Sequence, residues 1–225
     1  ALIKEATLDL ICYAAKQGIS TELTTNGYLI DKYIAGSLVQ SGLKTLVLSL
    51  DSLKPEVHDF LRGVEGIYAR VMNAINYLSK LAKKNRLKIH VVTTIMGFNI
   101  DDILELTEWV ESNDSIDHIG FQAIMQPFAS SEDNSWYKKD KLSFLWPNDI
   151  SKVDYVLDRL IKLKQKPDSK ITNLIGQFKV FNQYFRNPDY FVKQTECNLG
   201  YNSITVNTQG DIYLCNYLEP IGNIQ

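Results

Sequence analysis

Apolar residues along the first half of the chain follow two spacings that alternate with each other. Helical spacing predicts helices around Leu8–Ala15, over about Asp31–Gln40, from about Gly66 onward and around Ile103–Val110. Short runs of aliphatic and β-branched residues predict strands at 21–25, 43–50, 88–96 and 118–124. Strands separated by single helices are typical of parallel β/α units. The pattern predicts an α/β fold, built as an open or closed barrel or as a doubly wound sheet.

The pattern changes after Gln126. Residues 127–149 show little periodicity, and their tryptophan and tyrosine residues suit a substrate lid, a partner contact or ordinary packing; these are Trp136, Tyr137 and Trp146. Two helices are predicted within 150–161 and 174–185. A β-hairpin is predicted from 201–206 and 211–215 around a turn at 207–210. We expect three parts: a β/α part (1–125), a loop and helical connector (126–192) and a further domain from 193 to 225.

Composition narrows the classes of function. The chain has 225 residues, with 24 Lys and Arg against 26 Asp and Glu, so a broadly basic surface for nucleic acid is not expected. The longest apolar runs fall well short of the ~18 residues that a membrane-spanning helix needs. Three cysteines are too few and too scattered for a secreted disulfide scaffold. A cytoplasmic location is therefore expected.

Polar side chains follow the predicted strands where each strand ends. Ligands of parallel β/α folds bind at the carboxyl ends of strands, so these positions are candidates for a binding site. Hydroxyl, amide and carboxylate groups suit the ribose and amine of a nucleotide-like ligand, and methionine suits its adenine. The alternative is that these residues only form turns and helix caps. The candidates are Thr25, Asn26, Ser49, Asp51 and Met125.

Taken together, four motifs resemble the core of the radical SAM enzymes, with a texture similar to peptide maturases and to the cyclic pyranopterin synthases of molybdenum-cofactor synthesis. They are Thr-Thr-Asn-Gly (24–27), Ser-Leu-Asp-Ser (49–52), Glu-Val-His-Asp (56–59) and Leu-Arg-Gly (61–63). The resemblance implies a partial (β/α)6 barrel that holds a [4Fe–4S] cluster and S-adenosylmethionine. Cleavage of the latter gives a 5′-deoxyadenosyl radical that abstracts hydrogen from the substrate. It further implies a small-molecule or peptide substrate and an electron donor such as flavodoxin or ferredoxin.

The resemblance also implies roles for individual residues. Ser49 would contact S-adenosylmethionine, and Asp51 would lie beside its ribose. Met125 would face the adenine with its backbone, and Thr25 would face ligand or substrate. The other two positions are looser: Asn26 shapes the turn beside the ligand, and Arg62 is either a cation for the methionine carboxylate or a surface residue. No catalytic residue is assigned, and His58, His90 and His118 are expected to be solvated.

Parts that define the family are absent from the sequence. Three closely spaced cysteines would bind the radical-generating cluster, but Cys12 stands alone on the apolar face of a predicted helix and is expected in the core. The glycine-glycine-glutamate strand end is also missing. The expectation is that the chain starts after the first two strands of the barrel and that, as printed, it does not perform radical chemistry.

The other two cysteines form a second motif. The spacing Cys197-x(12)-Gly210-x(4)-Cys215 resembles the opening of the SPASM or twitch extension, in which such cysteines ligate an auxiliary [4Fe–4S] cluster. A cross-hairpin disulfide and two unrelated thiols are the alternatives. For the chain as a whole, the alternatives are a cluster-free β/α enzyme that binds another nucleotide and a non-catalytic binding module.

Overall fold

The computed structural model describes residues 6–85, 87–126, 135–139, 141–188, 203–215 and 218–224. Contacts divide the chain into two compact units, Ala1–Arg186 and Asn187–Gln225, which are treated separately below. The predicted boundary near residue 192 lies outside the described residues and stays a prediction. Among the described residues, no helix combines the length and hydropathy that crossing a bilayer requires.

The first unit alternates strands and helices, as the hydrophobic pattern predicts. Its strands are β1 (Glu22–Thr25), β2 (Thr45–Ser49), β3 (Lys88–Ile95) and β4 (His118–Ala123). Its helices are α1 (Ala6–Lys16), α2 (Lys32–Gln40), α3 (Pro55–Arg62), α4 (Ile67–Asn85), α5 (Ile103–Ser112), α6 (Ile150–Lys164) and α7 (Ile175–Arg186), with 3-10 turns η1 (Trp136–Lys138) and η2 (Ser143–Leu145).

The four strands form one parallel sheet in the order β1-β2-β3-β4. Its register is continuous across the sheet, with pairs Thr25↔Leu48, Leu48↔Val91 and Val91↔Ile119. Parallel neighbours joined by helices are what the sequence predicts, so the α/β class is confirmed, and the arrangement is consistent with part of a β/α barrel. All four strands end at the same edge, which we call the carboxyl edge.

A further segment closes the β4 side of the sheet. Ile171 forms a parallel bridge with Ile119, and the Asn173 side chain bonds both backbone groups of Phe121, accepting from its N–H at 2.7 Å and donating to its carbonyl at 2.9 Å. An asparagine amide can replace a strand residue because it carries one donor and one acceptor in a plane. The exposed backbone of β4 is thereby partly paired.

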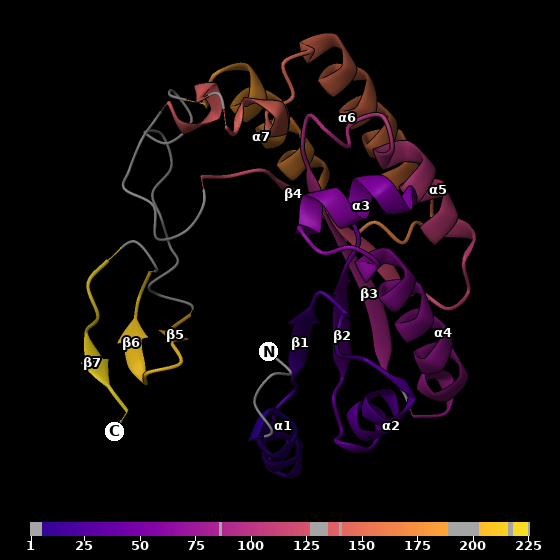
Figure 1. The fold of residues 1–225 in the computed structure, drawn as a ribbon, viewed down its shortest axis with the longest axis vertical. Coiled ribbons are helices and arrows are strands. Elements are labelled where there is room, and N and C mark those ends of the chain that lie inside the picture. Colours follow the sequence, from indigo (N-terminus) through magenta and orange to yellow (C-terminus); the bar gives the residue numbers. More distant parts are fainter. Residues whose placement is uncertain are drawn as a thin grey trace. The chain divides into compact units, whose positions relative to one another are not determined.

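Among the described helices, those that pack on the sheet in its core lie on one of its two faces. Figure 1 shows α2, α4 and α5 on one side of the strands. The core on that side includes Leu23, Leu46, Leu48, Ile89, Val91, Ile119 and Phe121, with helix residues such as Leu38, Leu78 and Leu106. Successive strand residues point to opposite faces, so the remaining positions share the second face. This open face carries Thr24, Val47, Ser49, His90, Val92, Thr94, His118, Gly120 and Gln122.

The two tryptophans of the connecting segment, Trp136 and Trp146, are packed in the core. Trp146 is 5% exposed, and its ring lies 5.2–5.9 Å from the rings of Trp136, Tyr184 and Phe185. These are ordinary edge-to-face aromatic contacts. Of the three alternatives raised by the sequence, packing is the one that the structure supports.

The second unit is a small antiparallel sheet of β5 (Thr205–Val206), β6 (Asp211–Tyr213) and β7 (Gly222–Asn223). The β5–β6 pair is the hairpin that the sequence predicts, with Val206 opposite Ile212. Its turn is fixed by the Asn207 side-chain oxygen, which accepts from the Gln209 and Asp211 N–H groups, while Gly210 takes a positive φ of 89°. The third strand was not predicted.

Candidate functional site

The carboxyl edge of the sheet collects most of the predicted site residues. Thr25 is the last residue of β1, Ser49 is the last residue of β2, and Met125 follows the end of β4 by two positions. They meet at one edge because the strands are parallel and in register. The side chains, however, do not all face the same way.

Ser49 lies on the open face. It is nearly buried, and its register partners across the sheet are Val92 and then Gly120. Its hydroxyl forms no hydrogen bond with any residue that the structure describes. A hydroxyl that can both donate and accept, left unpaired at a strand end, is suited to binding a polar ligand.

Thr25 lies on the opposite face, which the helices cover. Its register partner is Leu48, the residue before Ser49, so the pleat turns Thr25 and Ser49 to different sides. Thr25 is buried, and its hydroxyl accepts a hydrogen bond from the Gly27 N–H at 3.2 Å. The expected ligand contact of Thr25 is not supported by this geometry; its neighbour Thr24, which is exposed, shares the face of Ser49.

Asn26 serves the turn after β1. Its side-chain oxygen accepts from the Tyr28 N–H at 3.2 Å, and Gly27 adopts φ = 76°. A Cβ at Gly27 would approach Val71 of α4 to 3.1 Å, so the turn also packs closely on the helix. The turn-forming part of the prediction is what the structure shows for Asn26.

Asp51 and Arg62 bind each other rather than standing free. The Arg62 Nη2 lies 2.7 Å from the Asp51 Oδ2, and the Thr94 N–H donates to the Asp51 Oδ1 at 3.1 Å. Both carboxylate oxygens are thus engaged within the protein, and Asp51 is 1% exposed. Burial raises the pKa of Asp51, against the attraction of Arg62. The ribose role predicted for Asp51 and the carboxylate role predicted for Arg62 therefore differ from the arrangement observed.

His58 is buried, contrary to the solvated position expected from the sequence. Its exposed fraction is 0%, and its Nδ1 accepts from the Asp51 N–H at 3.2 Å. Burial, with a further contribution from Arg62, lowers the pKa of His58 to about 4, so the ring is neutral near pH 7. The imidazole also packs edge-on against Tyr68, with 6.2 Å between ring centroids.

Asn99 completes the same network from the loop after β3. Its side-chain N–H groups donate to the carbonyls of Asp51 and Thr94, and its oxygen accepts from the Met96 N–H, at 2.8–2.9 Å. The sequence places Asn99 after a strand but gives no sign that it joins two strand ends. Burial deprives these three backbone groups of hydrogen bonds to water, and the Asn99 side chain replaces those bonds. Asn99 therefore stabilises the loop.

The remaining histidines pair on the open face. His90 and His118 are register partners on β3 and β4, and their rings lie edge to face with centroids 4.7 Å apart. Both are half-buried rather than solvated. Burial, followed by the charge of His118, lowers the pKa of His90. The two histidines are in register with Val47, two residues before Ser49 on β2. They therefore lie on the same face as Ser49, nearer to the beginnings of the strands.

Met125 lies at this edge with its side chain exposed. It is 54% exposed, while its neighbour Ile124 donates its N–H to the Ile95 carbonyl at 3.2 Å. The expected adenine contact would use the backbone of Met125, and that role stays a prediction.

Three phenylalanines line the same edge from three different segments. Phe60 of α3, Phe98 of the loop after β3 and Phe144 of η2 pack with ring centroids 4.7–6.1 Å apart. Each remains more than 40% exposed. The three rings form an exposed apolar surface at the carboxyl edge, beside the polar network of Asp51, Arg62, His58 and Asn99.

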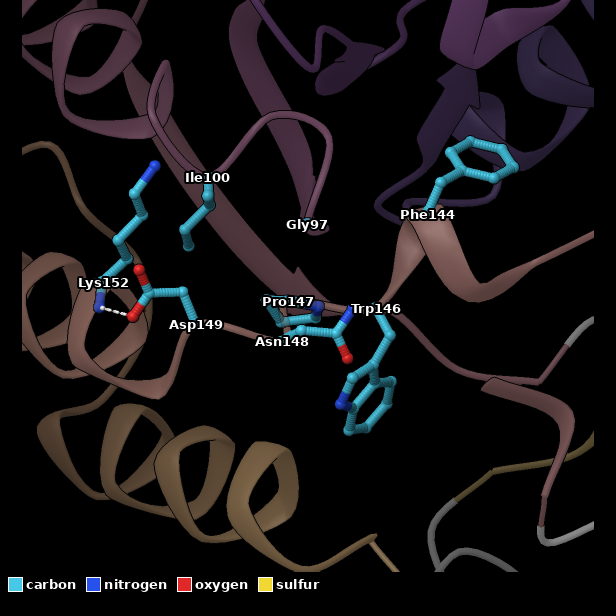
Figure 2. A pocket seen from close by; sticks show the side chains of 8 residues that line it. All are labelled: Gly97, Ile100, Phe144, Trp146, Pro147, Asn148, Asp149 and Lys152. Atoms are coloured by element: carbon cyan, nitrogen blue, oxygen red, sulfur yellow. Dashed lines mark hydrogen bonds between the residues drawn. The ribbon is translucent and has the colours of Figure 1, made fainter. Parts of the chain in front are cut away.

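A cavity of about 210 Å³ lies between the loop after β3 and the start of α6 (Figure 2). Its lining residues are Gly97, Ile100, Phe144, Trp146, Pro147, Asn148, Asp149 and Lys152. The polar groups have internal partners: Asp149 accepts from the Ser151 and Lys152 N–H groups, and the Lys152 ammonium pairs with Asp101 at 2.8 Å. Asp149 thereby caps α6, and none of the predicted site residues lines this cavity.

Known proteins match the chain in both sequence and fold. The family model described as Radical SAM superfamily matches residues 1–110. An AdoMet-dependent heme synthase of Methanosarcina barkeri is 22% identical over the whole chain and 63% of its own length. A GTP 3′,8-cyclase of Nautilia profundicola is 37% identical over 40% of this chain and 27% of its own length.

The fold agrees with these matches. The crystal structure of Streptococcus suis SuiB bound to S-adenosylmethionine matches 92% of this chain and 45% of its own, with a TM-score of 0.59 at 20% identity. The comparisons place residues 1–110, just under half of the chain, with the radical SAM superfamily. It spans less than two thirds of the length of the curated relatives described above.

The cysteines of the chain bear on where an iron–sulfur cluster could be held. The described residues contain no group of three or more Cys, His, Asp or Glu side chains that could hold a metal ion. Cys12 is half-buried on α1, and Cys215 follows β6; neither forms a disulfide with another described residue. Cys197 lies outside the described residues. No described residue is therefore assigned to the radical-generating cluster.

Proposed function

We propose that this chain provides the S-adenosylmethionine-binding part of a radical SAM enzyme, at the carboxyl edge of its parallel sheet. The observation that carries the proposal is the unpaired, nearly buried Ser49 hydroxyl on the open face. Exposed Thr24 shares that face and extends the polar surface toward the beginnings of the strands. Superfamily membership of residues 1–110 and the fold of S-adenosylmethionine-bound SuiB support the same ligand.

The residues of this chain would bind and orient the ligand. Ser49 would contact a polar group of S-adenosylmethionine, and the apolar Val92 beside it would exclude water from that contact. Bound in such enzymes, S-adenosylmethionine supplies a 5′-deoxyadenosyl radical that abstracts hydrogen, chemistry that also needs the iron–sulfur cluster. Since no described residue is assigned to that cluster, no step is derived through it.

The relatives support a proposal for the substrate class. Their names describe a heme synthase and a GTP cyclase, which act on small molecules. We propose a small-molecule or peptide substrate, with flavodoxin or ferredoxin as electron donor, in a cytoplasmic enzyme. The low cysteine count is the basis for that location.

The test of the ligand site is the affinity for S-adenosylmethionine, measured by calorimetry on the anaerobic full-length protein. Ser49→Ala should weaken binding about tenfold or more, since a hydrogen bond to a charged ligand contributes about 1.5–3 kcal/mol. Ser79→Ala is the matched control, because Ser79 is a half-buried serine of α4 whose hydroxyl donates to the Asn76 carbonyl of the same helix. Unchanged affinity in Ser49→Ala would refute the proposed contact.

An auxiliary cluster is proposed for the second unit, with Cys197 and Cys215 as two of its ligands. The support is the cysteine spacing together with the β5–β6 hairpin, after which Cys215 lies two residues beyond β6. Iron and sulfide should fall in the full-length Cys197→Ala, Cys215→Ala variant and stay unchanged in Cys12→Ala. If the double variant keeps all the iron, the two cysteines are not cluster ligands.

A further inference from the structure

The two residues after β2, Leu50 and Asp51, have all of their backbone N–H and carbonyl groups hydrogen-bonded. The Leu50 N–H donates to the Val92 carbonyl at 3.0 Å, and the Leu50 carbonyl accepts from the Thr93 hydroxyl at 2.7 Å. The Asp51 carbonyl accepts from Asn99 at 2.8 Å. These three bonds tie Leu50 and Asp51 to β3 and its loop.

The fourth bond is different, because it ties the same strand end to helix α3. The Asp51 N–H donates to His58 Nδ1 at 3.2 Å. At 1% exposure, Asp51 has no water to replace that acceptor, so its N–H depends on His58. Arg62, one helical turn after His58, reaches the Asp51 carboxylate from the same helix.

The buried imidazole has a cost that its packing alone does not explain. Because Nδ1 accepts, the ring proton sits on Nε2, and that atom is buried without a hydrogen-bond partner among the described residues. A leucine could fill similar volume without an unpaired N–H group. The contribution that only the imidazole makes is the acceptor at Nδ1.

We infer that His58 is a positioning residue for the proposed ligand site: its Nδ1 fixes the Asp51 amide and thereby the placement of the Ser49 hydroxyl two residues earlier. The inference rests on the proposed function, since Ser49 is the group that meets the ligand. His58 itself does not touch it. The Ser49 hydroxyl has no hydrogen-bond partner among the described residues, so its position depends on how firmly the strand end is held.

The test compares His58→Asn with His58→Gln in the full-length protein. The two side chains carry the same amide group but differ in length. The asparagine oxygen lies near the place of Nδ1, whereas the glutamine oxygen lies near the place of Nε2. Hydrogen–deuterium exchange of the Asp51 amide and the affinity for S-adenosylmethionine are measured for both. Thr107→Val, which loses a buried hydrogen bond within α5, is the control for general loss of stability.

We expect His58→Gln to exchange the Asp51 amide faster and to bind S-adenosylmethionine about three- to tenfold more weakly, while His58→Asn stays close to the wild type. Ser49→Ala combined with His58→Gln should bind no more weakly than Ser49→Ala alone, because both act on one contact. Equal exchange in both His58 variants would overturn the inference, as would faster exchange with unchanged affinity. If Ser49→Ala itself binds normally, the proposed function fails and the inference with it.

Discussion

Ser49 and Thr25 end neighbouring parallel strands, yet their side chains lie on opposite faces of the sheet. Thr25 is paired with Leu48, which places it under the helices, whereas Ser49 is on the open face. Strand ends that are adjacent at one edge therefore have different roles. Thr25 supports the turn after β1, and Ser49 is available to a ligand.

This relationship gives the first prediction. Thr24→Val, on the face of Ser49, should weaken S-adenosylmethionine binding with little change in stability. Thr25→Val should leave the affinity unchanged but lower the free energy of unfolding by about 1–2 kcal/mol, because the buried Gly27 N–H loses its acceptor. Calorimetry and urea unfolding of both variants test it; the reverse assignment of the two effects would contradict the face assignment.

The second prediction concerns the Asp51–Arg62 pair. Arg62→Gln leaves a buried carboxylate without its cation and should lower the free energy of unfolding by about 2–3 kcal/mol, a value reduced because the Arg62 side chain is 26% exposed. Asp51→Asn should cost less, since the cation that remains is the more exposed partner. Adding Asp51→Asn to Arg62→Gln should restore part of the loss. Additive losses in the double variant would show that the two groups do not interact.

The third prediction is a pH dependence that comes from His58. The pKa of the buried ring is about 4, below the ordinary value of about 6.5, so the unfolded chain takes up a proton that the folded chain does not. The contribution of His58 to stability should be full above about pH 6.5 and fall as the pH is lowered toward 4, by on the order of 2–3 kcal/mol in total.

Urea unfolding between pH 4 and 7.5 measures this contribution as the difference between the wild type and His58→Asn. The difference removes the other titrating groups, including His90 and Asp51, from the comparison. A difference that does not change over that range would mean that His58 is not neutral and buried in solution.

The fourth prediction concerns Gly97, where the loop after β3 meets the η2 segment. The Gly97 N–H donates to the Leu145 carbonyl at 2.7 Å, and a Cβ on Gly97 would lie 2.8 Å from the Trp146 carbonyl carbon. Gly97→Ala should therefore lower the free energy of unfolding by about 1–3 kcal/mol. Gly36→Ala, with open space around it in α2, should be neutral or raise it by about 0.5–1 kcal/mol. Equal effects in thermal unfolding would mean that Gly97 is not in close contact.

Several features of the molecule could be predicted from the sequence because they depend on local spacing. The helical spacing of Ile103 and Val110 and the aliphatic run of β2 predict their elements to within a few residues. The parallel class follows from single helices between strands, and with it the common edge for Ser49 and Thr25. Asp31 caps α2 through the Ile34 N–H, as helix starts commonly do.

Other features were decided only by the tertiary structure. Asp102 precedes α5 as a cap would, but its carboxylate instead accepts from Ser52, 50 residues away, and pairs with Lys54. Asn99 reaches Asp51 across 48 residues. The sequence suggests an exposed position for His58 because histidine is polar. In the fold its buried ring accepts a hydrogen bond from the Asp51 N–H. Such long-range bonds leave no periodic trace in a sequence.

The same limit explains why the sequence did not reveal which faces of the sheet Thr25 and Ser49 occupy. Alternation fixes that neighbouring strand residues point apart, but it reveals which side is the core only when one side is polar. In β2 four consecutive residues are buried, Leu46 to Ser49, so the sequence of that strand cannot show which of them faces the helices. The register with β1 and β3, and the helices packed on Leu48, decide it, and they place Ser49 on the open face.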